Sequence, residues 1–147
     1  AYKPTVALEL IKLGVDVLDS SYCQIITNLN RAMVFNFDLE NSLKVFPEID
    51  LLDEKFKDDF TPFVEGCQCL SCRNHTKAYT HHLLKTNELL GPMLLTIHNM
   101  FWYQKFFVTI QKAIGDGKLQ DLSELVCARY SETCLNYEPP VKVIEKE

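Results

Sequence analysis

The sequence predicts an α/β fold that continues into a small, mainly helical subdomain. The first part of the chain places a helical pattern, a glycine, a short apolar run and a polar residue one after another, the order that α/β proteins repeat. Later, three cysteines fall within six residues, and stretches of helical pattern follow them. With 147 residues, 47% hydrophobic and 24% charged, the chain is long enough and ordinary enough in composition for one domain with a core.

The first predicted elements are a helix and a strand. Residues 5–13 carry apolar side chains at helical spacing, with Pro4 beside the first turn and Gly14 just after the last. Residues 15–18 form an apolar run that predicts a short strand, and this strand ends at Asp19. The unit of helix, glycine and strand is the main support for the α/β class.

A hairpin and an acidic segment are expected next. Apolar and polar residues partly alternate over residues 32–37, which predicts a strand paired in a hairpin with residues 23–27. Residues 38–59 hold eight acidic residues against three lysines, which favours a solvated loop. Within that loop, residues 49–52 predict one short strand.

Three helices are expected after the cysteines. Asn74 and Thr76 are both suitable N-caps for a helix that runs to about residue 86. A longer helix is predicted over residues 88–114, because a Gly-Asp-Gly sequence follows it as a C-terminal signal. A third helix is predicted over residues 119–134 from its apolar spacing.

The cysteine-rich segment predicts a metal site. Cys67, Cys69 and Cys72 are dense enough for one ion to take all three thiolates. Zinc binds Cys sulfur and His nitrogen in a tetrahedral shell, and three Cys with one His make a closed structural set with no place for a catalytic water. A disulfide with a spare thiol is the alternative, but side chains one residue apart rarely meet the bridge geometry. We therefore expect one structural zinc ion.

Sequence spacing leaves the fourth ligand open. His98 lies 26 positions after Cys72, in the middle of the longest predicted helix, so it would pin the cysteine loop to that helix. His75, His81 and His82 compete for the same role. Adjacent His81 and His82 point about 100° apart on a helix, so at most one of them can face the ion.

Charge and hydropathy exclude some classes of protein. The net charge of −5 argues against a protein that coats nucleic acid nonspecifically, and no apolar run is long enough to span a bilayer. Six cysteines with no visible signal peptide indicate a reducing compartment. One stretch is locally basic and predicts either a nucleic-acid backbone contact or a solvated helix face. Its members are Arg73, His75, Lys77, His81, His82 and Lys85.

Several motifs, in order and at matching spacing, resemble the C-terminal region of the tRNA-guanine transglycosylases, from about residue 4 to about residue 130. They are Gly14-Val15-Asp16-Val17-Leu18-Asp19, Cys67-x-Cys69-x2-Cys72, Ala78-Tyr79-x-His81-His82-Leu83, Asn87-Glu88-Leu89-Leu90 and Leu94-Leu95-x-x-His98-Asn99. The resemblance implies the C-terminal part of a (β/α)8 TIM barrel with an inserted zinc-binding, mainly helical subdomain. It also implies Cys67, Cys69, Cys72 and His98 as the zinc ligands.

The resemblance implies three segments. Residues 1–66 would supply the last barrel helix and strand, the hairpin and the acidic loop. Residues 67–135 would form the zinc-binding subdomain together with the helix that closes the barrel, and residues 136–147 would be a flexible tail. We therefore expect this chain to be the C-terminal part of a larger protein.

Asp19 occupies the position of the family's nucleophilic aspartate, which attacks the ribose C1′ of the wobble guanosine and displaces guanine. Catalytic members follow that residue with Pro-Thr-Arg and a further Arg, whereas this chain continues Ser20-Ser21 and has no arginine before Arg31. Without those guanidinium groups, the anticodon loop loses bidentate partners. The sequence therefore favours the accessory, non-catalytic subunit of a queuine tRNA-ribosyltransferase, which supports exchange of guanine for queuine and has no catalytic residue. The alternatives are a catalytic transglycosylase with Asp19 as nucleophile and a plain zinc-binding interaction module.

The resemblance also implies partners. Family members dimerise through the zinc subdomain, which by motif position implicates His75, Tyr79, His82 and Leu90. A core position for Tyr79 is the alternative. The expected partners are a catalytic transglycosylase subunit in a heterodimer, or a second copy in a homodimer, and tRNA. The expected location is the cytoplasm, with the mitochondrial surface as a further site of association.

Overall fold

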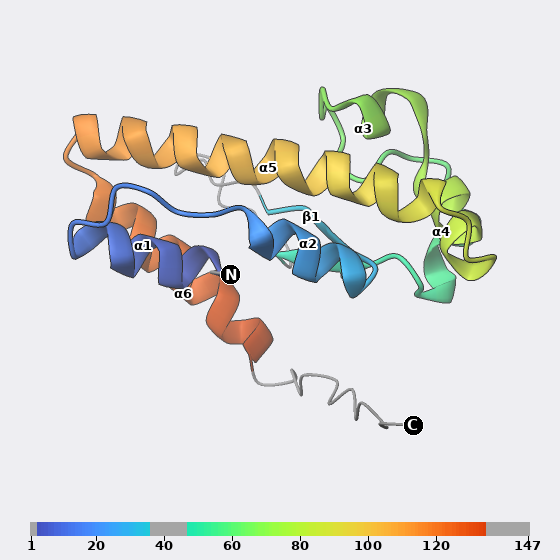
Figure 1. Cartoon of the computed structure of the whole chain (residues 1–147), viewed down its shortest axis with the longest axis horizontal. Coiled ribbons are helices and arrows are strands. Elements are labelled where there is room, and N and C mark those ends of the chain that lie inside the picture. The colour runs from blue at the N-terminus through green and yellow to red at the C-terminus, as the bar shows by residue number, and fades with distance from the viewer. Residues whose placement is uncertain (1–2, 36–46, 135–147) are drawn as a thin grey trace, which may run out of the picture.

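The structure is a computed structural model that describes residues 3–35 and 47–134, with side chains described as far as residue 130 (Figure 1). This part of the chain is mostly helical and carries one two-stranded sheet. No helix within it is both long and apolar enough to cross a membrane. The elements are α1 (Pro4–Lys12), α2 (Ser21–Asn28), β1 (Arg31–Met33), β2 (Glu48–Asp50), the 3-10 helix η1 (Glu54–Phe56), α3 (Leu70–Asn74), α4 (Lys77–Lys85), α5 (Leu90–Gly115) and α6 (Leu119–Cys134).

The long helix α5 organises the fold. It runs for 26 residues along one side of the molecule, and α2, β1, α3 and α4 all pack against it (Figure 1). At its C-terminal end the chain turns at Gly117, whose φ of 68° suits a glycine, and returns as α6, which packs on α1. The buried side of α5 carries ten residues, and these form the centre of the core. They are Gly91, Leu94, Leu95, His98, Asn99, Trp102, Tyr103, Phe106, Ile110 and Ala113.

The helices predicted after the cysteines are confirmed, with small shifts at their ends. Thr76, and not Asn74, caps α4, because its hydroxyl accepts a hydrogen bond from the Tyr79 N–H at 3.2 Å. Helix α5 begins at Leu90, two residues later than predicted. Its N-terminal turn lies close to α4, since a Cβ on Gly91 would come within 3.1 Å of the Leu84 side chain. The short helix α3, inside the cysteine segment, was not predicted.

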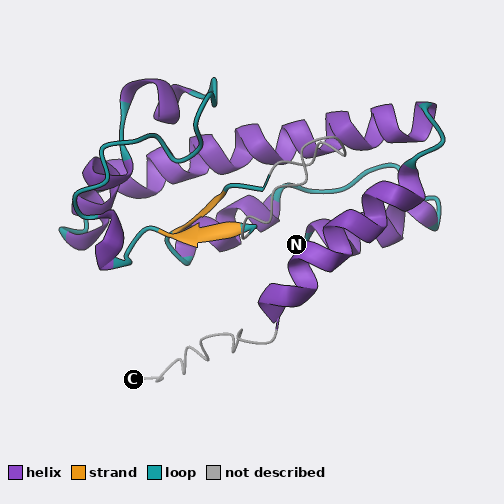
Figure 2. Ribbon diagram, turned by 180° about the vertical axis from the view of Figure 1, so that it is seen from behind, coloured by secondary structure: helices purple, strands orange, loops and turns teal. Residues whose placement is uncertain are grey.

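The sheet is antiparallel and joins β1 to β2, with Ala32 opposite Ile49 (Figure 2). The strand predicted over residues 49–52 is therefore present at Glu48–Asp50. The strand predicted over residues 32–37 begins one residue earlier and ends at Met33, while residues 36 and 37 lie outside the described residues.

The predicted hairpin partner is wrong, because residues 23–27 lie in helix α2. The buried residues of α2 are Tyr22, Cys23, Ile26 and Thr27, a spacing that places them on one face of a helix. The β-branched residues Ile25, Ile26 and Thr27 favour strands only weakly, and packing against α5 and β1 outweighs that preference.

The strand predicted over residues 15–18 is also wrong. This segment crosses from α1 to α2 without regular structure, and Val17 is 86% exposed. A strand needs a neighbouring strand for its backbone hydrogen bonds, and no described segment pairs with this one. The α/β expectation is thus met only in part: the described residues combine many helices with a small antiparallel sheet and contain no parallel sheet.

Candidate metal centre

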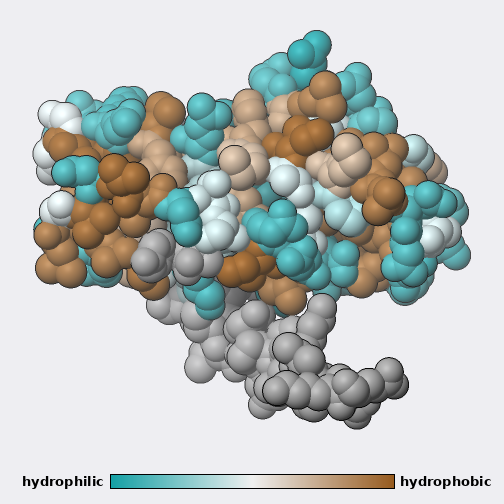
Figure 3. All heavy atoms as spheres, in the orientation of Figure 1, coloured by the Kyte–Doolittle hydropathy of each residue, from teal (hydrophilic) through white to brown (hydrophobic). Residues whose placement is uncertain are grey.

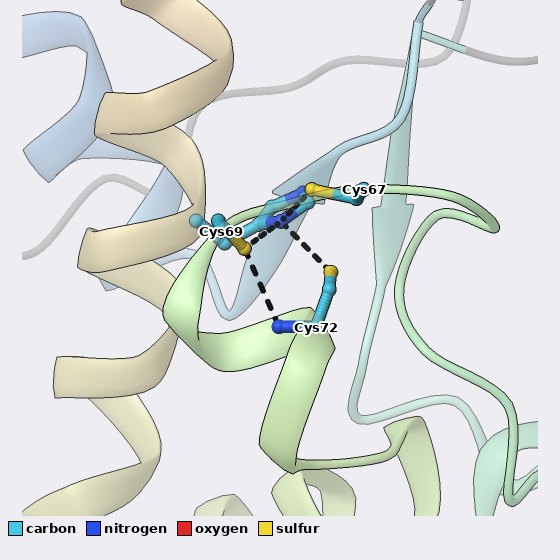
Figure 4. Close-up of side chains that lie close together, drawn as sticks. Cys67, Cys69 and Cys72 are labelled. Atoms are coloured by element: carbon cyan, nitrogen blue, oxygen red, sulfur yellow. Dashed lines mark hydrogen bonds between the residues drawn. The ribbon is translucent and has the colours of Figure 1, made fainter.

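Three cysteines from the loop before α4 meet one histidine from the middle of α5. The Nδ1 atom of His98 lies 4.0 Å from the sulfur of Cys67, 3.4 Å from that of Cys69 and 3.3 Å from that of Cys72. All four side chains are buried, and their candidate ligand atoms lie within 4.8 Å of one another. Figure 4 shows the three cysteine side chains turned toward one another.

The local sequence explains how the loop brings its sulfurs together. Gly66 adopts a φ of 73°, which lets the chain turn immediately before Cys67. Cys69 is the N-cap of α3, and its sulfur accepts a hydrogen bond from the backbone N–H of Cys72 at 3.3 Å. The turn of α3 therefore brings the sulfur of Cys72 close to those of Cys67 and Cys69.

Two further contacts fix the loop against α5. The hydroxyl of Ser71, which is fully buried, donates a hydrogen bond to the carbonyl of Leu94 at 2.7 Å, one turn before His98. The ring of Phe63 packs edge-on against the His98 imidazole, with centroids 4.9 Å apart. Sequence reasoning missed both residues. For Ser71 a signal existed, because a serine between two predicted ligands needs a hydrogen-bond partner once it is buried.

The second nitrogen of the His98 ring determines its tautomer. Nε2 lies 2.7 Å from the backbone carbonyl oxygen of Met33 in β1. A carbonyl oxygen only accepts, so Nε2 carries a hydrogen and donates it. The imidazole therefore directs Nδ1 toward the sulfurs, which is the arrangement that metal-binding histidines use.

The four side chains of the pocket shift one another's pKa values. A hydrogen bond with the Cys72 side chain lowers the pKa of Cys69 to about 3, and the same hydrogen bond together with burial raises the pKa of Cys72. Burial opposes ionisation of Cys67, but hydrogen bonds with the His98 ring and the Cys69 backbone hold the pKa of that thiol below its usual range. Burial likewise opposes the charged form of His98, yet its contacts with Cys67 and Cys69 raise the pKa of the imidazole. The cysteine sulfurs and the imidazole thus shift one another's pKa values.

The distances fit a tetrahedral ion. Typical bond lengths for zinc, about 2.3 Å to sulfur and about 2.0 Å to nitrogen, separate a sulfur and a nitrogen ligand by about 3.6 Å. The three Nδ1–sulfur distances, 4.0, 3.4 and 3.3 Å, bracket that value. The described cysteines are free thiols, so the alternative of a disulfide with a spare thiol does not occur among them.

The competing histidines lie elsewhere. The ring of His81 is buried, and its Nδ1 lies 2.7 Å from the carbonyl oxygen of Leu51. His75 stacks on Tyr79, with ring centroids 5.2 Å apart, and His82 is exposed. The structure therefore brings His98, and none of these three, to the cysteines.

The residues expected at an interface lie just before α4, on α4 and at the start of α5. Tyr79 is 41% exposed, so it is not a core residue, and Leu90 is 38% exposed. The rings of His75 and Tyr79 are nearly parallel, at 15°. The basic stretch around them is partly neutralised, because Lys77 pairs with Asp59 at 3.0 Å and Lys85 with Glu54 at 2.7 Å.

Asp19 lies at the surface, beside an open groove. Its Oδ1 accepts hydrogen bonds from the hydroxyl of Ser21 at 2.8 Å and from the Ser21 N–H at 3.3 Å, at the start of α2. The first of these bonds is the main cause of a lowered pKa for this carboxyl. The groove, of about 830 Å³, is lined mainly by apolar side chains such as Leu70 and Ile97.

Comparison with known proteins agrees with the resemblance seen in the sequence. The family model described as queuine tRNA-ribosyltransferase matches residues 1–132. A Drosophila melanogaster protein named "Queuine tRNA-ribosyltransferase accessory subunit 2" is 43% identical over 148 residues, which cover 99% of this chain and 35% of the relative. A Culex quinquefasciatus protein of the same name is 47% identical over 124 residues, 83% of this chain and 29% of the relative. The chain spans about a third of the length of these relatives. From the match over almost its whole length, the chain belongs to the queuine tRNA-ribosyltransferase family.

Proposed function

We propose that the full-length protein is the accessory, non-catalytic subunit of a queuine tRNA-ribosyltransferase and that this chain carries its structural zinc site. The accessory-subunit name borne by relatives at 42% to 47% identity is the observation that carries the proposal. The partners we propose are a catalytic subunit of the same family and tRNA. The cytoplasm suits the buried free thiols, because they stay reduced there.

Zinc is the ion that the donor set favours. Three buried thiolates and one imidazole are soft and borderline ligands, which select zinc over magnesium or calcium. Four protein ligands complete a tetrahedral shell, so the ion supplies structure and not a reactive water. Its mechanical effect is to tie the cysteine loop and α3 to the middle of α5.

An apolar stripe on α5 supports the larger barrel. Met93, Ile97, Met100 and Val108 are each between 38% and 59% exposed, and their spacing places them along one side of the helix. Figure 3 shows apolar patches, separated by polar ones, in the region of α5. We propose that the remainder of the protein covers this stripe, with α5 closing a (β/α)8 barrel. A row of exposed apolar side chains on one face of a helix is typical of a contact surface.

The surroundings of Asp19 favour an accessory role. Its carboxylate is engaged by Ser21, and the sequence offers no arginine between residues 20 and 30 to hold a tRNA phosphate. Purified full-length protein is therefore expected to exchange no labelled guanine into tRNA by itself, and to do so only with the catalytic subunit. In the assembled enzyme, Asp19→Asn should leave the covalent tRNA adduct intact.

Two results, one from that experiment and one from a pull-down, separate the alternatives. Exchange by the purified protein alone, with loss of the adduct in Asp19→Asn, would instead assign catalysis to this subunit. A pull-down from cell extract that recovers neither a transglycosylase subunit nor tRNA would favour the plain zinc-binding interaction module.

Acidification is expected to release the zinc. Binding requires three thiolates and a free Nδ1, but contact with Cys69 raises the pKa of Cys72, and contacts with the cysteines raise the pKa of His98 against the effect of burial. Because these contacts favour the protonated forms of Cys72 and His98, zinc must displace protons when it binds. The zinc affinity should therefore rise with pH. For each proton displaced, it should fall by about tenfold for every pH unit of acidification.

Competition with a chelator across the neutral range measures this dependence. Calorimetry in buffers of different ionisation enthalpy counts the protons that binding releases. An affinity that is independent of pH, with no proton release, would contradict the assignment of thiolate and imidazole ligands.

A further inference from the structure

Asn99 is a buried polar residue that follows His98 on α5. Its side chain is 0% exposed. The amide oxygen Oδ1 accepts a hydrogen bond from the N–H of Met33 at 2.9 Å. The amide nitrogen Nδ2 donates to the Thr27 hydroxyl at 3.0 Å and to the carbonyl of Arg31 at 2.9 Å. Both amide hydrogens and the amide oxygen therefore have partners.

These contacts supply hydrogen-bond partners to the backbone groups on the edge of β1 that faces away from β2. In an antiparallel strand, alternate residues direct their backbone groups to opposite sides. Residues 30 and 34 bond toward the β2 side, whereas Arg31 and Met33 direct their groups toward α5. An edge without a neighbouring strand would leave these groups unpaired and buried. Side chains of α5 take the place of that strand.

His98 and Asn99 hold the same residue of β1. The carbonyl of Met33 accepts from Nε2 of His98 at 2.7 Å, while the N–H of Met33 donates to Oδ1 of Asn99 at 2.9 Å. The carbonyl that orients the imidazole is thus itself positioned by the neighbouring amide. Outer partners of this kind set the ring orientation and the basicity of a metal-binding histidine.

We propose that Asn99 is a positioning residue for the metal centre, which keeps the Met33 carbonyl where it directs Nδ1 of His98 toward the three sulfurs. The inference rests on the proposed zinc site and adds a residue outside the ligand set. An alanine at this position removes the hydrogen bonds to the Met33 N–H, the Thr27 hydroxyl and the Arg31 carbonyl, so β1 can shift and release the ring.

The experiment uses full-length protein loaded with Co²⁺ in place of zinc, because the d–d absorption bands of Co²⁺ report ligand geometry. Asn99→Ala is expected to lower the Co²⁺ affinity, measured by chelator competition, by about 10- to 100-fold and to shift the d–d bands. The matched control is Ile110→Ala, which removes another buried residue of the same helix about three turns away. This control should lose stability but keep the affinity and the spectrum.

The outcomes separate the inference from the site on which it rests. If Asn99→Ala and Ile110→Ala bind Co²⁺ with the same affinity and spectrum, Asn99 is an ordinary core residue and the inference fails while the metal site stands. If the unaltered protein binds no Co²⁺ or zinc, the proposed site fails, and the inference fails with it.

A second variant carries the test if Asn99→Ala does not fold. Thr27→Val keeps the shape of a side chain that is 1% exposed and removes only one hydrogen bond to the Asn99 amide. It should shift the d–d bands in the same direction and lower the affinity by about fivefold. An unchanged spectrum and affinity in Thr27→Val would overturn the inference.

Discussion

Replacing His98 with alanine is expected to abolish tight zinc binding and to lower the free energy of unfolding by at least about 3 kcal/mol. The change removes the nitrogen ligand, the hydrogen bond to the Met33 carbonyl and a fully buried ring that packs on Phe63. Loss of a buried aromatic side chain costs about 3 to 5 kcal/mol by itself. Loss of an outer partner lowers metal affinity by about 10- to 100-fold, and loss of a ligand should exceed that range. Zinc content and denaturant unfolding of the purified variant measure the two effects.

His81→Ala provides a matched control. Both histidines are buried, and each places a ring nitrogen 2.7 Å from a backbone carbonyl, that of Leu51 for His81 and that of Met33 for His98. Both variants should therefore lose stability from packing and one hydrogen bond, but only His98→Ala should lose zinc. A His98→Ala protein that retains one zinc per chain at unchanged affinity would remove this residue from the ligand set.

The sequence predicted the elements whose signals are local. Helices α4, α5 and α6 follow from periodicity and terminal residues, because a helix satisfies its backbone hydrogen bonds within its own segment. The strands predicted over residues 15–18 and 23–27 were wrong, because a strand does not satisfy its backbone hydrogen bonds within its own segment. A strand depends on a partner, so a short apolar run does not reveal whether one is present.

The residues of the candidate site likewise divide into those that a local sequence signal predicts and those that only the packing brings together. The spacing of Cys67, Cys69 and Cys72 predicts one loop with three thiolates, and the structure brings these residues together as expected. The histidine comes from 26 residues further along, and the carbonyl that orients it lies 65 residues before it. Neither distance has a signature in the sequence, because both contacts depend on how β1 and the loop pack on α5. Resemblance to a family supplied the histidine, and only the structure supplied Met33 and Asn99.

Removing the stacked pair of His75 and Tyr79 is expected to weaken assembly with the proposed catalytic subunit by about 30-fold or more. His75 and Tyr79 form one aromatic platform, and Tyr79 is 41% exposed on the helix that the zinc loop supports. Stacked rings lose little conformational freedom on binding, and aromatic anchors at interfaces often contribute about 2 kcal/mol or more, which corresponds to about 30-fold in affinity. The exposed side chains His82 and Leu90 would extend the same contact.

The experiment compares His75→Ala/Tyr79→Ala with Val6→Ala in titrations of the catalytic subunit. Val6 is 43% exposed, close to the value for Tyr79, but lies on α1, at the other end of the molecule from α4 (Figure 1). The double variant should bind the catalytic subunit more weakly and still contain zinc, because neither residue belongs to the candidate ligand set. Val6→Ala should bind as the unaltered protein does. Weaker binding together with loss of zinc would instead locate the effect in the fold. Equal affinity for all three proteins would exclude this face of α4 from the heterodimer, and self-association that the double variant abolishes would assign the face to a homodimer.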